Sequence, residues 1–148
     1  MRAFNTFVLP IITFGSAVWF PRLEKHKILI EKVLRKFTKK IHPSLSYIDR
    51  LQTLNSTSLI GRFIIHDLTL SYKIINNISF IGNASFFTFL KSTRLHHHLS
   101  SILCRTDKHK HFFSNRIITY YNSISEDSKC SLKLFTNEID IKFEYHLV

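Results

Sequence analysis

Apolar residues recur at helical spacing in several stretches of this sequence, and the clearest stretch is residues 21–43. Proline stands at both ends of it, which predicts the limits of a single helix. At about 100° per residue, the apolar side chains of this helix fall on one stripe. The stripe comprises Leu23, Ile30, Val33, Leu34, Phe37 and Ile41. We therefore expect an amphipathic helix that packs through this stripe.

The opposite side of the same predicted helix is strongly basic. Its cations are Lys25, Lys32, Arg35, Lys36 and Lys39. Only Glu24 and Glu31 flank this sector, so it stays net positive. Like charges at this spacing destabilise an isolated helix, and the pattern therefore favours a polyanion that lies along the face. An ordinary solvated face is the alternative interpretation.

Two further helices are predicted between residues 46 and 77. Ser46 and Asp49 form a partial capping box for a helix over residues 46–54. Ser58 caps the next helix, which runs to about Asn76, and Asn77 completes a good stop signal. The apolar residues of this second helix recur at helical spacing. They are Ile60, Phe63, Ile64, Leu68 and Ile75.

The periodic pattern weakens between residues 78 and 113, which we interpret as an irregular connection that its aromatic residues partly pack. Helix resumes at about Ser114. The last stretch predicts either a helix capped at Ser131 or a strand at its end, from the alternation in residues 139–143. We expect an all-α protein with three parts: a helical bundle over 1–77, the connection over 78–113 and a helical extension over 114–148.

Composition adds a charge to this picture. The 148 residues include 21 Lys and Arg against 10 Asp and Glu, for a formal net charge of +11. Such an excess attracts phosphate, either on nucleic acid or on anionic lipid. Three glycines and three prolines favour helices over a loop-rich β fold. Two cysteines form no disulfide framework and fit a reducing compartment, so we favour an intracellular location, nuclear or cytoplasmic, over secretion.

Residues 7–21, "FVLPIITFGSAVWFP", allow two interpretations. The apolar run with small residues after it is typical of a secretion signal, with Arg2 as a weak basic start. Pro10 and Gly15 interrupt the run, which is shorter than the roughly 18–20 residues of a membrane span. The alternative is a core helix that ends between Gly15 and Pro21.

Candidate chemistry is sparse. Histidines and cysteines gather in the second half of the chain: His96, His97, His98, Cys104, His109, His111 and Cys130. Their spacing matches no zinc-finger pattern, so we expect no metal and no cofactor. The adjacent acidic pair Glu126-Asp127 lies in "NSISEDS", which we interpret as a turn and helix cap rather than a catalytic pair.

Six segments of the sequence carry motifs that occur in the same order in one protein family. They are "RAFNTFVLPIITFGSAVWFP", "IEKVLRKFTKKI", "LSYIDRLQTLN", "SLIGRFIIHDLTLSYKIIN", "STR" at residues 92–94 and "RTDKHKHFFSNRIITYYNSI". In this order they resemble the segment after the catalytic palm in reverse transcriptases of LINE, jockey-like non-LTR retrotransposons. Three positions depart from the pattern: Phe63 replaces a second Arg, Tyr121 a Trp and Ser125 a Pro.

The resemblance covers nearly the whole chain and implies a helical bundle like a polymerase thumb with a post-thumb extension. Residues 7–21 then correspond to the helix and turn that lead into the thumb, not to an export signal. The family's catalytic aromatic-x-D-D motif, whose carboxylates hold two metals, belongs to the palm and is not found in this sequence. We therefore expect a fragment without catalytic residues that is not an enzyme on its own.

The implied role is sequence-independent binding of RNA or RNA–DNA hybrid through phosphate contacts, with a polymerase palm as a further partner and no membrane. The first candidates for phosphate contact are the five cations Lys25, Lys32, Arg35, Lys36 and Lys39. A second group is Arg62, Lys108, Lys110 and Arg116. The aromatic residues Trp19, Phe37, Tyr72 and Phe113 are expected to pack, with base stacking as the minor alternative.

Two other functions stay open. One is a relic of a mobile element with no activity, marked by an exposed apolar patch where a palm is absent. That patch would comprise Phe4, Phe7, Val8 and Ile11. The other is a basic, amphipathic protein of the membrane surface.

Overall fold

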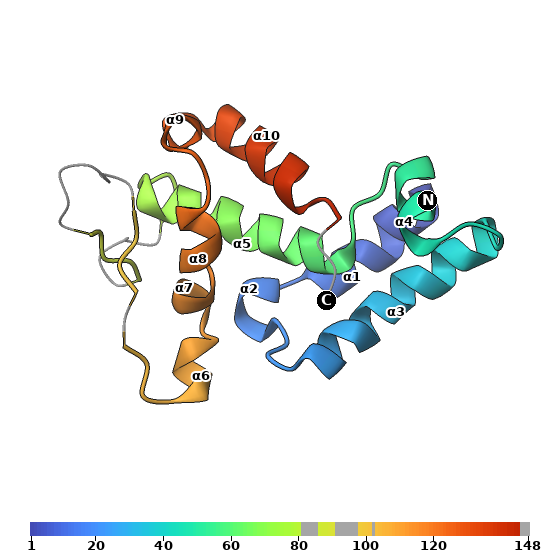
Figure 1. The fold of residues 1–148 in the computed structure, drawn as a ribbon, viewed down its shortest axis with the longest axis horizontal. Coiled ribbons are helices and arrows are strands. Elements are labelled where there is room, and N and C mark those ends of the chain that lie inside the picture. The colour runs from blue at the N-terminus through green and yellow to red at the C-terminus, as the bar shows by residue number, and fades with distance from the viewer. Residues whose placement is uncertain (81–85, 91–97, 102, 146–148) are drawn as a thin grey trace. The chain divides into compact units, whose positions relative to one another are not determined.

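The computed structural model describes residues 1–80, 86–90, 98–101 and 103–145, and these form an all-α protein (Figure 1). Across these residues the only β pairing is an isolated antiparallel bridge between Phe89 and Leu99. The all-α prediction is confirmed. Within the same ranges, each helix is too short or too polar to cross a bilayer.

The chain divides into two compact units. The first unit is Met1–Ile64 with Lys142–Val148, and the second is Ile65–Ile141. The boundaries fall inside helices, because α5 (Leu59–Ile75) and α10 (Leu132–Phe143) each run from one unit into the other. The three segments expected from the sequence, 1–77, 78–113 and 114–148, stay a prediction.

The first unit begins with a π-helical turn, η1 (Phe4–Val8), followed by α1 (Leu9–Thr13) and α2 (Ser16–Trp19). Helices α3 (Glu24–Ile41) and α4 (Tyr47–Thr53) and the start of α5 complete it. Its core is a cluster of buried apolar residues with half-buried neighbours that include Phe37 and Tyr47. The buried members are Phe4, Leu34, Leu51 and Leu59.

Residues 7–21 form two short helices rather than one. Gly15 lies in the left-handed region at φ 64° and separates α1 from α2. The Trp19 indole N–H closes this turn by donating to the Phe14 carbonyl at 2.6 Å, and its ring meets Phe63 edge-on at 5.4 Å. One side of the segment faces solvent: Phe7, Ile11, Phe14 and Val18 are 70, 78, 83 and 91% exposed. Phe4, by contrast, is buried, so its expected place in an exposed patch is wrong.

Helix α3 confirms the helix predicted between the two prolines, but its buried side is rotated from the predicted stripe. The buried residues are Glu31, Leu34 and Thr38, with Ile30 and Phe37 half-buried. Three members of the predicted stripe, Leu23, Val33 and Ile41, are exposed. The rotation follows from Glu31, which packs inward because it has partners there.

Local capping signals in this part of the chain are confirmed. The Asp49 N–H donates to Ser46 Oγ at 3.3 Å, and the Ser46 hydroxyl donates to the Asp49 carboxylate at 2.6 Å. Ser58 accepts from the Gly61 N–H at 3.0 Å at the start of α5. Helix α5 ends at Ile75, where Asn77 adopts φ 55°, as its stop signal predicts.

The second unit contains α6 (Asp107–Lys110), α7 (Phe113–Arg116), α8 (Ile118–Asn122) and α9 (Glu126–Lys129) with most of α5 and α10. Its centre is aromatic: the Phe135 ring lies 4.6 Å from Tyr72 and 5.8 Å from Tyr121. The alternative of a strand near the C-terminus is wrong, because α10 continues to Phe143. Residue Ile139 of that alternation is buried while Ile141 is exposed, which suits a helix.

Candidate nucleic-acid interface

The five cations predicted on one side of α3 are all exposed. They are Lys25, Lys32, Arg35, Lys36 and Lys39, and they lie away from the side that buries Glu31, Leu34 and Thr38. Lys40 is exposed next to them and was not among the predicted residues. We call these six residues the α3 basic face. Its exposure was predicted correctly, while its binding partner stays a prediction.

Both carboxylates of α3 have partners outside the α3 basic face. Glu24 pairs with Lys27 at 2.7 Å across the first turn of the helix. Glu31 is buried, and its Oε1 accepts hydrogen bonds from the Tyr47 hydroxyl and, at 3.3 Å, from the Leu59 N–H. Its Oε2 accepts from the Ile60 N–H at 3.1 Å. The expectation that Glu31 flanks the basic sector is therefore wrong.

Glu31 is buried because the first N–H groups of α5 need acceptors. These N–H groups have no partner within their own helix, and the positive end of the helix dipole favours a carboxylate there. Burial, then the hydrogen bond and charge of Glu31, raise the pKa of the Tyr47 phenol well above its ordinary value. A sequence signal existed: Glu31 shares a helical side with Leu34 and Thr38, three and seven positions on.

Tyr47 also positions the arginine of the basic face. The Arg35 guanidinium lies over the Tyr47 ring at 4.7 Å from its centroid, and Arg50 lies 5.7 Å from the same centroid. Arg50 is buried and donates to the Leu45 carbonyl at 2.7 Å. Arg35 therefore stacks on Tyr47 and is still exposed to solvent.

Apolar side chains lie among the lysines, which the sequence interpretation did not include. Ile28, Leu29 and Val33 are exposed on α3. At helical spacing Ile28 falls between Arg35 and Lys39, and Leu29 falls next to Lys36. The exposed side of α3 is therefore mixed in character.

Arg62, a candidate of the second group, is half-buried. Its Nε donates to the Thr57 carbonyl at 3.3 Å and its Nη2 donates to Ser56 Oγ at 3.4 Å. Burial lowers the pKa of the guanidinium, and the charge of Glu31 opposes this. These contacts brace the turn before α5.

In the second unit, Lys108 and Lys110 are exposed on α6, whereas Arg116 is bound to Asp67. Its Nη2 and Nε donate to Asp67 Oδ2 at 2.7 and 2.9 Å, with both side chains largely buried. Its Nη1 donates to the His111 carbonyl at 3.3 Å. Burial raises the pKa of Asp67, and the charge and hydrogen bonds of Arg116 act in the opposite direction. Arg116 therefore uses these donors within the fold, while its contact with phosphate stays a prediction.

The aromatic residues assigned to packing mostly pack. Tyr72 and Phe113 are buried, and Phe37 is half-buried with its ring 4.8 Å from Phe4. Trp19 remains 42% exposed.

The acidic and metal-ligand candidates have other roles or lie outside the described residues. Glu126 pairs with the buried Lys129 and with His98, each at 3.2 Å. His96 and His97 fall outside the described ranges, as does "STR" at 92–94. Among the residues that are described, no group of three or more His, Cys, Asp or Glu side chains is arranged to hold a metal.

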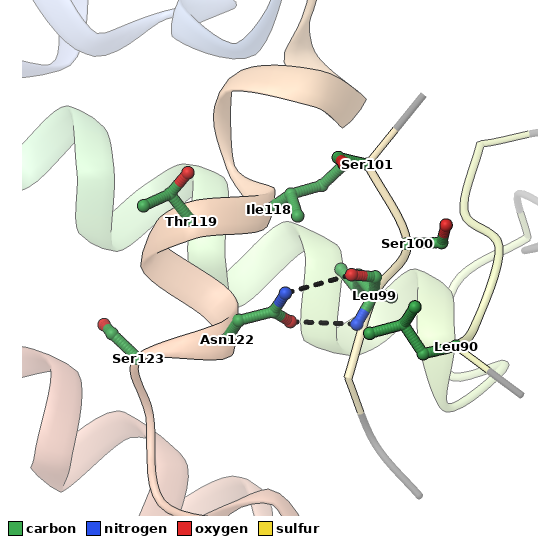
Figure 2. A pocket seen from close by; sticks show the side chains of 8 residues that line it. All are labelled: Leu90, Leu99, Ser100, Ser101, Ile118, Thr119, Asn122 and Ser123. Atoms are coloured by element: carbon green, nitrogen blue, oxygen red, sulfur yellow. Dashed lines mark hydrogen bonds between the residues drawn. The ribbon is translucent and has the colours of Figure 1, made fainter. Parts of the chain in front are cut away.

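An open pocket of about 540 Å³ lies in the second unit (Figure 2). Two hydrogen bonds join Asn122 and Leu99 in the lining of this pocket. The Asn122 Oδ1 accepts from the Leu99 N–H at 2.8 Å, and the Asn122 Nδ2 donates to the Leu99 carbonyl at 2.9 Å. The lining residues are Leu90, Leu99, Ser100, Ser101, Ile118, Thr119, Asn122 and Ser123. None of these carries a charge, so the pocket offers phosphate no cation.

No family model, curated protein or solved structure matches this chain.

Proposed function

We propose that this chain binds the phosphate backbone of RNA or RNA–DNA hybrid through the α3 basic face, without reading the base sequence. In this proposal it is the thumb and post-thumb part of a LINE, jockey-like reverse transcriptase. It has no polymerase activity alone and acts with a palm domain. The proposal rests on six motifs in a common order and on one feature of α3.

That feature is that both carboxylates of α3 have partners outside the basic face. Glu24 is paired with Lys27, and Glu31 is buried under the start of α5. In the described part of the chain, Lys25, Lys32, Lys36 and Lys39 form no ion pair, so each can replace a counterion on a phosphate. A surface that served only solubility would keep its acids among its lysines.

Contacts between motifs support the resemblance. Glu31 of "IEKVLRKFTKKI" meets Tyr47 of "LSYIDRLQTLN", and Asp67 of "SLIGRFIIHDLTLSYKIIN" meets Arg116 of "RTDKHKHFFSNRIITYYNSI". These four residues act in folding, and the phosphate contacts are left to the surface lysines. One of these contacts thus stabilises the first unit, which carries the basic face, and the other stabilises the second.

A salt titration of hybrid binding tests the proposal. We expect the affinity for an RNA–DNA hybrid to fall linearly with salt on logarithmic axes. The double variant Lys32→Ala/Lys36→Ala should reduce that slope by about two, since each lysine bound to a phosphate contributes about one. The matched control is Lys73→Ala/Lys133→Ala, which removes two exposed lysines of the second unit. Absence of binding at about 50 mM salt, or a slope unchanged by the α3 variant, would contradict the proposal.

A second candidate function is binding to an anionic membrane surface. The observation that favours it is the exposure of Ile28, Leu29 and Val33 among the lysines of α3. Co-sedimentation with vesicles that contain phosphatidylserine separates the two. Binding to vesicles with none to hybrid would select the membrane surface.

A further inference from the structure

The second unit carries a separate basic segment that the α3 proposal does not use. Residues 103–112 contain Arg105, Lys108 and Lys110 against one carboxylate, Asp107. All four residues and His109 are exposed. Among the described residues, Arg105, Lys108 and Lys110 form no ion pair. The segment is therefore net positive and open to solvent.

Hydrogen bonds tie residues 106–111 of this segment to the start of α7. Thr106 Oγ1 caps α6 by accepting from the His109 N–H at 3.3 Å, and Asn115 Nδ2 donates to the His109 carbonyl at 2.8 Å. Arg116 donates to the His111 carbonyl at 3.3 Å while Asp67 on α5 holds its other N–H groups. The ion pair that removes Arg116 from the surface thus anchors the turn that carries the lysines. Figure 1 shows α6, α7 and α8 in succession, with α6 at one end.

An exposed aromatic residue follows these cations in the sequence, two positions after Lys110. Phe112 is 50% exposed, whereas its neighbour Phe113 is 6% exposed and meets Phe87 edge-on at 6.0 Å. Phe112 is the N-cap residue of α7, so the backbone that presents its ring belongs to the same anchored turn. Proteins that bind single strands combine exposed rings with cations, because each base can stack while its phosphate meets a cation, and residues 103–112 expose both kinds of side chain.

We propose that residues 103–112 bind single-stranded RNA or DNA, with a base stacked on Phe112 and phosphates on Arg105, Lys108 and Lys110. Duplex is excluded as the preferred ligand because paired bases keep their faces covered, and only an unstacked base reaches a ring. The inference shares only its class of ligand with the proposed function, and it depends on the second unit alone.

Fluorescence anisotropy of the full chain with an oligouridine strand of about 12 nucleotides tests it. Phe112→Ala should weaken binding about tenfold with the salt slope unchanged, since stacking carries no counterion release. Lys108→Ala/Lys110→Ala should instead reduce the slope by about 0.7 for each phosphate that the variant no longer binds. The controls are Phe80→Ala, an exposed ring of the same unit, and Lys133→Ala.

A second measurement reports stacking directly. Oligouridine should quench the tryptophan fluorescence of Phe112→Trp more than that of the wild type, whose single tryptophan is Trp19. Wild-type affinity in Phe112→Ala together with an unquenched Trp at position 112 would overturn the inference, as would loss of equal size in both controls. Binding to phosphatidylserine vesicles in place of oligouridine would also overturn it.

The two proposals fail separately. Lys32→Ala/Lys36→Ala should weaken hybrid binding, and should weaken oligouridine binding less than Phe112→Ala does. If oligouridine binding is lost in this α3 variant while the Phe112 and Lys108/Lys110 variants bind normally, the single-strand site is wrong and the α3 face takes both ligands. Oligouridine binding that depends on Phe112, with no hybrid binding at all, supports the single-strand site and rejects the α3 proposal.

Discussion

Among the described residues, each unit of this protein buries one carboxylate, and the two are stabilised in different ways. Glu31 in the first unit accepts hydrogen bonds from neutral donors: two backbone N–H groups of α5 and the Tyr47 hydroxyl. Asp67 in the second unit pairs with a cation, Arg116, through a single oxygen, while its Oδ1 is buried without a partner. A buried acid thus needs either several neutral donors or one charge, and the two solutions respond differently to mutation.

The largest expected effect is at the charge pair. Asp67→Ala leaves the Arg116 guanidinium buried and charged, because arginine does not lose its proton, and should lower the free energy of unfolding by about 3–5 kcal/mol. Arg116→Ala should cost less, because Asp67 can take up a proton. Urea unfolding of the two variants checks the order, and equal losses would contradict it.

The same pair predicts a pH dependence. Burial raises the pKa of Asp67 above its ordinary 3.8, so this carboxyl loses its proton at a higher pH in the folded state than in the unfolded chain. Arg116→Ala removes the charge and hydrogen bonds that oppose this rise in pKa, so the stability of the variant should fall as the pH rises from about 4 through the folded pKa. The deficit of Arg116→Ala against wild type should therefore be smaller near pH 4 than at pH 7.

A smaller effect is expected at Glu31. Glu31→Ala leaves the N–H groups of Leu59 and Ile60 and the Tyr47 hydroxyl without their acceptor and should cost about 2–3 kcal/mol. Glu31→Gln keeps one acceptor oxygen and should recover about half of this loss. Glu24→Gln, on the exposed end of the same helix, is the control and should stay within about 0.5 kcal/mol of wild type. If Glu31→Gln behaves like Glu31→Ala, the charge rather than the hydrogen bonds holds α5.

The smallest loss of stability is expected at Tyr47, together with a change in the pH dependence in alkaline solution. The folded pKa of this phenol is raised above the ordinary 10.0, so the unfolded chain loses the proton first. The stability that Tyr47 contributes is present below about pH 10 and is lost as the pH rises further. Tyr47→Phe should cost about 1 kcal/mol at neutral pH and make the decline above pH 10 shallower than in wild type. Parallel decline in both proteins would show that Tyr47 does not titrate differently on folding.

Local patterns predicted much of this fold. The two prolines around α3, the Ser46–Asp49 cap and the Asn77 stop each act within a few residues of the chain, so sequence alone locates them. The exposed side of α3 was also predictable, because five cations at helical spacing leave few other arrangements.

The interactions that the sequence did not predict join distant residues. Glu31 lies 28 positions from Leu59, and Asp67 lies 49 positions from Arg116. A local pattern therefore places Glu31 at a solvent boundary and Arg116 on a basic surface, since both residue types are usually exposed. The rotated buried side of α3 has the same origin, because Glu31 packs inward and Val33 is left in solvent.

The chain has one tryptophan, and its setting makes it a natural optical probe. Trp19 is tied to the Phe14 carbonyl across the Gly15 turn and touches Phe63, all within the first unit. Tryptophan emission should therefore report unfolding of the first unit and not of the second. Tyrosine absorbance or circular dichroism can follow the second unit. Comparing the two signals in one denaturation would reveal whether the halves of this polypeptide unfold together or in turn.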